Sequence, residues 1–222
     1  MSIAIAIDGP AGAGKSTIAK MAAKELGFIY VDTGALYRAI GLYAYRKNVS
    51  AQDKDAVIAL LKEITVELDF NEYGEQIVLL NGEDVSGLIR TPEISMMASA
   101  VSAIPEVRAF LMDTQRNMAH TKNVIMDGRD IGTVVLPDAK LKIFLYASPE
   151  CRARRRYDEL KAKGMDVTYE DVLQDVIDRD YADSHRDIAP LKPAEDAVLV
   201  DTSGEDRETS FNRLIKIMRE HI

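Results

Sequence analysis

One short loop motif constrains this chain more than any other stretch of its sequence. Residues 9–16 are GPAGAGKS, which meets the pattern Gly-x-x-x-x-Gly-Lys-Ser at Gly9, Gly14, Lys15 and Ser16. The apolar residues 3–7 before it are typical of a buried parallel strand, and apolar residues recur after it at helical spacing as far as Leu26. A strand, a glycine-rich loop and a helix in this order predict a phosphate-binding loop.

The residue types of the loop explain what it can hold. Glycines let successive backbone N–H groups converge on phosphate oxygens, Lys15 can bridge terminal phosphates, and the Ser16 hydroxyl can ligate Mg²⁺. Asp127 ends a later apolar strand, where a carboxylate can organise that ion directly or through water, although ordinary turn chemistry would also explain it. The residues predicted to form this nucleotide-phosphate site are Gly9, Pro10, Ala11, Gly12, Ala13, Gly14, Lys15, Ser16 and Thr17.

Strand-like and helix-like segments alternate along most of the chain. Apolar strands are predicted at residues 3–7, 28–32, 123–127, 140–147 and 196–201, with helices between them. This alternation predicts one α/β domain over residues 1–222, a three-layer sandwich around a parallel sheet of roughly five strands. Short strands and turn residues interrupt it at residues 64–100, which predicts a small antiparallel hairpin insert. Asp53 is the predicted N-cap of a helix at residues 53–64.

Composition limits the possible partners and the compartment. The net charge of −8 argues against binding to nucleic-acid backbones or anionic membranes. Cys151 is the single cysteine, so an intramolecular disulfide cannot form, which suits a reducing compartment. With no signal-peptide pattern at residues 1–7, we expect a cytoplasmic protein. We also expect a monomer, because no long exposed apolar stretch requires a partner.

Phosphate loops serve switches, motors, sensors and kinases. The chain lacks the Asn-Lys-x-Asp segment that a GTPase switch uses to bind guanine. Motor ATPases usually receive an arginine from a neighbouring subunit, whereas this chain carries its own cluster at residues 152–156. A small-molecule kinase is therefore favoured, and a regulatory module that binds ATP without turnover is the alternative from another class.

Four further segments carry a family resemblance: DTGALYRA (32–39), MDGRDIGT (126–133), SPECRARRRY (148–157) and RDYADSHRDIAPL (179–191). In this order, after a phosphate loop and around a hairpin insert, they closely resemble bacterial cytidylate kinases of the nucleoside-monophosphate kinase group. The resemblance implies transfer of the γ-phosphoryl group from Mg-ATP to CMP or dCMP. It also implies that residues 64–100 are the monophosphate-side insert and residues 150–186 the lid region. Kinases of AMP, UMP or dTMP are the nearest alternatives.

The resemblance also implies a set of CMP-binding residues. Arg38 and Arg129 would hold the acceptor phosphate, since a planar guanidinium matches two phosphate oxygens. Asp130 would accept from the cytosine amino group, and Arg108 would donate to the ring nitrogen and carbonyl. The full implied set is Thr33, Tyr37, Arg38, Ser99, Arg108, Arg129, Asp130, Asp183 and Arg186. Surface ion pairs, an N-cap at Thr33 and a core tyrosine at Tyr37 are the structural alternatives.

The arginine cluster supplies the charge that phosphoryl transfer needs. Arg152, Arg155 and Arg156 stand at i, i+3 and i+4, so one helical face presents all three. On the resemblance they are catalytic together with Lys15, closing over ATP as part of the lid, and a solvated helix face is the alternative. Arg154 would point elsewhere.

Overall fold

The computed structural model describes residues 2–222, and they divide into two compact units. Unit 1 is the chain up to Tyr30 together with Lys122–Ile222, and unit 2 is Val31–Thr121. The phosphate loop lies in unit 1 and the predicted insert in unit 2.

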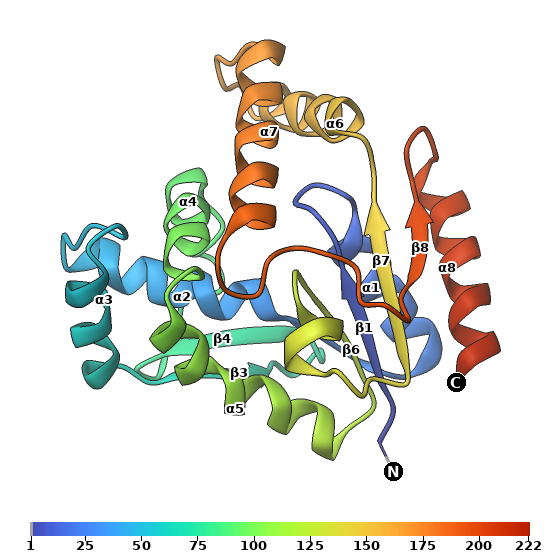
Figure 1. Cartoon of the computed structure of the whole chain (residues 1–222), viewed down its shortest axis with the longest axis horizontal. Helices are drawn as coiled ribbons and strands as arrows, with labels where there is room; N and C mark the ends of the chain where they lie inside the picture. Colours follow the sequence, from blue (N-terminus) through green and yellow to red (C-terminus); the bar gives the residue numbers. More distant parts are fainter. Residues whose placement is uncertain (1) are drawn as a thin grey trace. The chain divides into compact units, whose positions relative to one another are not determined.

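A five-stranded sheet with the order β2-β6-β1-β7-β8 carries the phosphate loop (Figure 1). β1 pairs in parallel with β6 and β7, and β7 pairs in parallel with β8. The predicted parallel sheet is confirmed. The strands are β1 (Ala4–Asp8), β2 (Ile29–Asp32), β6 (Val124–Gly128), β7 (Leu141–Tyr146) and β8 (Val198–Asp201).

Two helices of unit 1 pack against the sheet and share its apolar core. Ala19 and Ala22 of α1 join Leu214 and Met218 of α8 in one cluster with buried residues of β1, β6, β7 and β8. The small side chains of α1 let its backbone come close to the strands. The helices of unit 1 are α1 (Lys15–Leu26), α6 (Pro149–Ala162), α7 (Tyr169–His185) and α8 (Arg207–His221), with a π-helical turn η2 (Ile131–Val135).

Helices α6 and α7 lie against each other over a small core of their own (Figure 1). Ala153, Leu160 and Val172 are buried there. The rings of Tyr157 and Tyr169 meet edge to face, with their centroids 6.1 Å apart. This pair of helices covers most of the predicted lid region.

Unit 2 contains a second, antiparallel sheet and four helices. β3 pairs with β4 as the sequence predicts, and β4 also pairs with a two-residue strand, β5, which is too short to leave a sequence pattern. Asp53 caps α3 by accepting from the Ala56 N–H at 3.1 Å, which confirms that prediction. The elements are α2 (Thr33–Arg46), α3 (Lys54–Leu60) with a 3₁₀ turn (Leu61–Glu63), β3 (Val66–Phe70), β4 (Gln76–Leu80), β5 (Glu83–Asp84), α4 (Pro92–Val101) and α5 (Pro105–Thr121).

The helices were also compared with the length and composition of a membrane span. Within residues 2–222, no single helix is long and apolar enough to cross a membrane. In the same described part of the chain, α4 and α5 taken together reach that length and composition, and a bend of 101° separates them.

Candidate functional site

The phosphate loop joins the end of β1 to the start of α1. At Gly9 the backbone has φ +148°, and a Cβ there would lie 1.9 Å from the carbonyl oxygen of Leu145, so only glycine fits. The Lys15 ammonium donates to the carbonyl of Pro10 at 2.8 Å, which ties the loop to its own helix. Burial, together with the charge of Arg129, lowers the pKa of Lys15 to about 7.

Ser16 and Asp127 bring two oxygen ligands together beside this loop. The Ser16 hydroxyl donates to Oδ2 of Asp127 at 2.6 Å, and the Tyr30 hydroxyl donates to Oδ1 at 3.1 Å. A hydroxyl and a carboxylate are hard oxygen donors of the kind that Mg²⁺ prefers, so the pair fits this ion. Within residues 2–222, no cluster of three or more His, Cys, Asp or Glu side chains could hold a metal.

Two ion pairs follow the end of β6 in unit 1. Nε of Arg129 donates to Oδ2 of Asp183 at 2.9 Å, and Nη2 of Arg186 lies 3.7 Å from Oδ1 of Asp130. Burial alone would raise the pKa of Asp183, but nearby arginines, with Arg129 first, bring it below its ordinary value. Four residues that the resemblance assigns to CMP are thus paired with one another.

The CMP-assigned residues of unit 2 lie on α2, α4 and α5. Arg38 and Arg90 both donate to Oδ2 of Asp32, at 3.3 and 3.2 Å. Oδ1 of Asp32 accepts from the Ala35 N–H, so Asp32, and not Thr33, is the N-cap of α2. The resemblance assigns no function to Asp32 or Arg90.

Arg108 and Tyr37 form a second group in unit 2. The guanidinium carbon of Arg108 lies 5.8 Å from the centre of the Tyr37 ring, and Nη1 donates to the carbonyl of Ser102 at 3.3 Å. Arg108 is buried, and Ser99 is half-buried on α4, two residues before the end of that helix. Packing against the ring fixes the direction of the Arg108 side chain.

The four arginines of α6 have different surroundings. Arg152 is buried: it donates to the carbonyls of Ala147 and Ala11, and it pairs with Asp180 through both Nη atoms. Arg155 donates to the carbonyl of Thr202 at 3.0 Å.

Arg155 also lies close to the phosphate loop, because its Nη1 is 4.0 Å from where a Cβ on Gly14 would be. Arg156 is half-buried and lies 3.7 Å from Glu159. Arg154 lies over the Tyr169 ring, with its guanidinium carbon 4.4 Å from the ring centre, so it has a packing partner on α7.

Comparison with known proteins assigns this chain to a family. The family model of cytidylate kinases matches residues 5–220. The chain belongs to the cytidylate kinase family. It is 52% identical over 221 residues to the cytidylate kinase of Caldanaerobacter subterraneus subsp. tengcongensis, covering 100% of this chain and 96% of that protein. It is 50% identical over 214 residues to the cytidylate kinase of Carboxydothermus hydrogenoformans, covering 96% of both chains.

The fold alone is shared more widely. A solved structure of an uncharacterised protein from Eubacterium ventriosum aligns with a TM-score of 0.51 at 12% identity, covering 98% of this chain and 99% of that one. As a member of the cytidylate kinase family, the chain is a kinase, a nucleotide-binding transferase that uses ATP. The recognition of this family from four sequence segments is confirmed.

Two residues of the candidate site in this member of the cytidylate kinase family were not predicted from the sequence. Asp8 accepts two backbone N–H groups of η2, and Asp180 pairs with Arg152. Asp8 directly follows a buried strand, a position that could have been noticed as a strand-end carboxylate. Asp180 is one of several acidic residues along α7, and the sequence does not distinguish it from the others.

Proposed function

We propose that this kinase transfers the γ-phosphoryl group of Mg-ATP to CMP or dCMP, giving ADP and CDP or dCDP. The observation that carries the proposal is the buried Lys15 in a complete phosphate loop, next to the Ser16–Asp127 pair, in a chain that matches cytidylate kinases over nearly its whole length. An acidic chain with concentrated arginines suits a reaction in which catalysis is positioning and neutralisation of oxyanions.

The phosphate loop would hold the donor nucleotide. Backbone N–H groups of residues 9–17 bind the phosphates of ATP, and Lys15 donates to the terminal phosphates once these displace the carbonyl of Pro10 as its partner. Ser16 ligates Mg²⁺, and Asp127 holds the ion directly or through a water. The bound ion neutralises charge on the β- and γ-phosphates.

The acceptor needs no general base. Its nucleophile is a phosphate oxygen whose second pKa is about 6, so it is mostly ionised at neutral pH. Arg38 and Arg129 bind this phosphate. In the structure Arg38 is paired with the carboxylate of Asp32, and Arg129 is paired with that of Asp183. These carboxylates keep the two guanidinium groups oriented until an anionic substrate competes for them.

The cytosine base and its sugar would be recognised by polar groups that are already fixed. Asp130 accepts from the amino group of cytosine, while Arg108 and Ser99 supply the other hydrogen bonds to the base. Asp183 and Arg186 bind the sugar hydroxyls, and Thr33 and Tyr37 line the acceptor pocket. Uracil presents a carbonyl where cytosine presents its amino group, so a buried Asp130 would reject UMP.

The helices α6 and α7 would act as the lid over ATP. Arg155 lies beside the loop at Gly14 and neutralises the transferring group with Arg156, while Arg152 joins the loop backbone at Ala11 to Asp180 of α7. Residues 64–100 are the insert on the monophosphate side. We also expect the protein to be a cytoplasmic monomer that binds neither nucleic acid nor membranes.

A coupled ADP-release assay across CMP, dCMP, UMP, AMP and dTMP tests the substrate. We expect turnover of CMP and dCMP well above that of the other three. Comparable turnover of AMP or UMP would overturn the cytidylate specificity while leaving the kinase class intact.

A further inference from the structure

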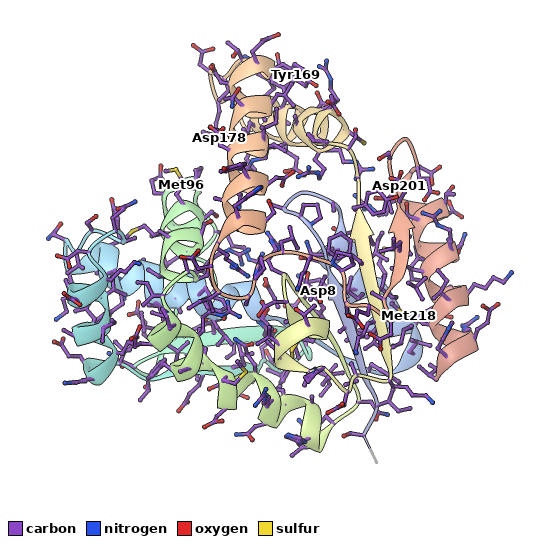
Figure 2. The ribbon with its side chains drawn as sticks, in the orientation of Figure 1. Asp8, Met96, Tyr169, Asp178, Asp201 and Met218 are labelled. Atoms are coloured by element: carbon purple, nitrogen blue, oxygen red, sulfur yellow. The ribbon has the colours of Figure 1, made fainter. Side chains whose placement is uncertain are left out.

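Asp8, labelled in Figure 2, ends β1 directly before the phosphate loop, and its carboxylate contacts the start of η2. Oδ1 accepts from the Ile131 N–H at 2.8 Å, and Oδ2 accepts from the Gly132 N–H at 2.7 Å. Asp8 is buried, with 4% of its surface exposed. Both carboxylate oxygens are therefore used on two consecutive backbone groups.

These two N–H groups open a helical turn that has no cap of its own. Ile131 and Gly132 are the first residues of η2, so their N–H groups find no acceptor inside the turn. The preceding residue, Asp130, makes no capping hydrogen bond with its side chain, and its carbonyl accepts from Val134 and Val135. Asp8, at the end of β1, thus caps the separate helical turn η2.

The cap fixes the backbone immediately after Asp130. Asp130 has φ −147° and ψ 26°, and its side chain is directed at Arg186. A Cβ on Gly132 would lie 3.1 Å from Lys142 and 3.4 Å from Oδ2 of Asp8. The start of the turn is therefore packed closely against both of these side chains.

A carboxylate at this position is costly, which indicates that its two acceptors matter. Burial, with a contribution from the like charge of Asp130, raises the pKa of Asp8 to about 6, although both backbone hydrogen bonds oppose the rise. Asparagine would remove the charge, but it offers a single acceptor oxygen and would turn an NH₂ toward an N–H donor. Only a carboxylate satisfies both donors at once.

We propose that Asp8 is a positioning residue for base recognition: by capping η2 it sets the orientation of Asp130, and so the discrimination between cytosine and uracil. This rests on the proposed function of Asp130. Asp8 touches no substrate, and its effect passes through the backbone of Ile131 and Gly132. It joins the strand that leads into the phosphate loop to the segment that reads the base.

The test compares Asp8→Asn with a destabilised control, Leu214→Ala, which opens the apolar core beneath α8. In Asp8→Asn we expect the ratio of kcat/KM for CMP to that for UMP to fall about threefold or more, with the KM for CMP rising and the KM for ATP nearly unchanged. The amides of Ile131 and Gly132 should exchange with solvent at least about tenfold faster. Leu214→Ala should lower the melting temperature and leave the ratio unchanged.

A milder variant covers the case in which Asp8→Asn does not fold. Gly132→Ala pushes on Lys142 and Asp8 and should shift the ratio in the same direction. An unchanged ratio in a folded Asp8→Asn or Gly132→Ala protein, despite faster exchange at Ile131, would overturn the proposal. Asp130→Asn distinguishes failure of the proposed function of Asp130 from failure of the proposed function of Asp8. If Asp130→Asn also leaves the CMP-to-UMP ratio unchanged, the assignment of Asp130 to base recognition fails. If Asp130→Asn alone changes the ratio, only the proposed function of Asp8 fails.

Discussion

The hydroxyl of Ser16, at the start of α1, donates a 2.6 Å hydrogen bond to the carboxylate of Asp127, on β6 beside the strand that leads into the phosphate loop. The contact bridges 111 residues of sequence. It places the two protein oxygens assigned to Mg²⁺ at one point of the site. Asp127 is buried, so its charge is little screened by solvent.

Replacing Asp127 by asparagine should weaken the use of Mg-ATP. The amide is neutral, so we expect kcat/KM for ATP to fall about 10- to 100-fold and the half-maximal rate to need more Mg²⁺. Initial rates measured across a magnesium titration check this. Tyr30→Phe is the matched control, because it removes the other hydrogen bond to Asp127 and keeps the carboxylate. An unaltered magnesium dependence in Asp127→Asn would leave Asp127 as a structural partner of Ser16.

Lys15→Ala should lose turnover by orders of magnitude while the fold survives. The loop backbone remains, but the ammonium that would neutralise the terminal phosphates is gone. Turnover assays and circular dichroism on the same sample measure the two effects. Lys24→Ala removes an exposed lysine from the last turn of the same helix and should keep the wild-type rate. Near wild-type turnover in Lys15→Ala would mean that the loop is not the catalytic site.

The elements that define the fold could be predicted because their sequence patterns are long and local. Five apolar runs gave the strands of the parallel sheet, and the helix from Lys15 to Leu26 was predicted with its bounds. The two-residue strand β5 and the π-helical turn η2 were not predicted. β5 has only two residues, which is too few to show a period, and η2 is capped by Asp8 from a distant part of the sequence.

The candidate site was predictable only where residues stand in recognisable motifs. Asp130 and Arg186 come from such motifs, but the ion pair between them comes from the fold. Asp8 and Asp180 were missed because each acts through a partner more than twenty residues away, Ile131 and Arg152. A single carboxylate after a strand or on an acidic helix has too many possible partners for the sequence to decide among them.

Two neighbouring arginines on α6 allow a matched test of the lid. Arg155 lies beside the phosphate loop, whereas Arg154 is exposed and lies over the Tyr169 ring. We expect Arg155→Ala to lower kcat about 100-fold or more, because it removes a positive charge that neutralises the transferring phosphoryl group. Arg154→Ala carries the same change of charge and should affect mainly the packing of α6 on α7. Equal losses of kcat in both variants would show that the loss comes from the change in net charge and not from the position of Arg155 beside the loop.

Asp130→Asn tests the recognition of cytosine. The amide can accept and donate, so it can turn its NH₂ toward the uracil carbonyl. We expect kcat/KM for CMP to fall by the equivalent of about 1 to 3 kcal/mol, and discrimination against UMP to narrow. Because Arg186 lies 3.7 Å from this carboxylate, a purely structural function would instead lower the rates for both substrates equally, together with the melting temperature. The CMP-to-UMP ratio of efficiencies decides between these outcomes.

The buried carboxylate of Asp8 predicts a pH dependence of stability. Its pKa is raised from 3.8 to about 6 in the folded protein, by burial first and by the nearby charge of Asp130, against the lowering by Lys15 and the two N–H groups of η2. The folded chain therefore binds this proton more tightly than the unfolded chain between these values. As pH rises through this window the contribution of Asp8 to stability decreases, and above pH 6 it stays at its lower level.

Asp8→Asn cannot titrate, so the difference between the two proteins isolates this contribution. From pH 7.5 to pH 5.5, the free energy of unfolding of the wild type should rise relative to that of Asp8→Asn by roughly 1 kcal/mol. Urea unfolding of both proteins at a series of pH values in this range provides the comparison, in which other titrating groups largely cancel. Because the folded wild-type protein takes up the proton on Asp8, its free energy of unfolding must rise relative to that of Asp8→Asn as the pH falls. A constant difference would mean that Asp8 is already ionised throughout this range and that its hydrogen bonds outweigh the cost of burial. A difference of opposite sign would contradict the raised pKa of Asp8.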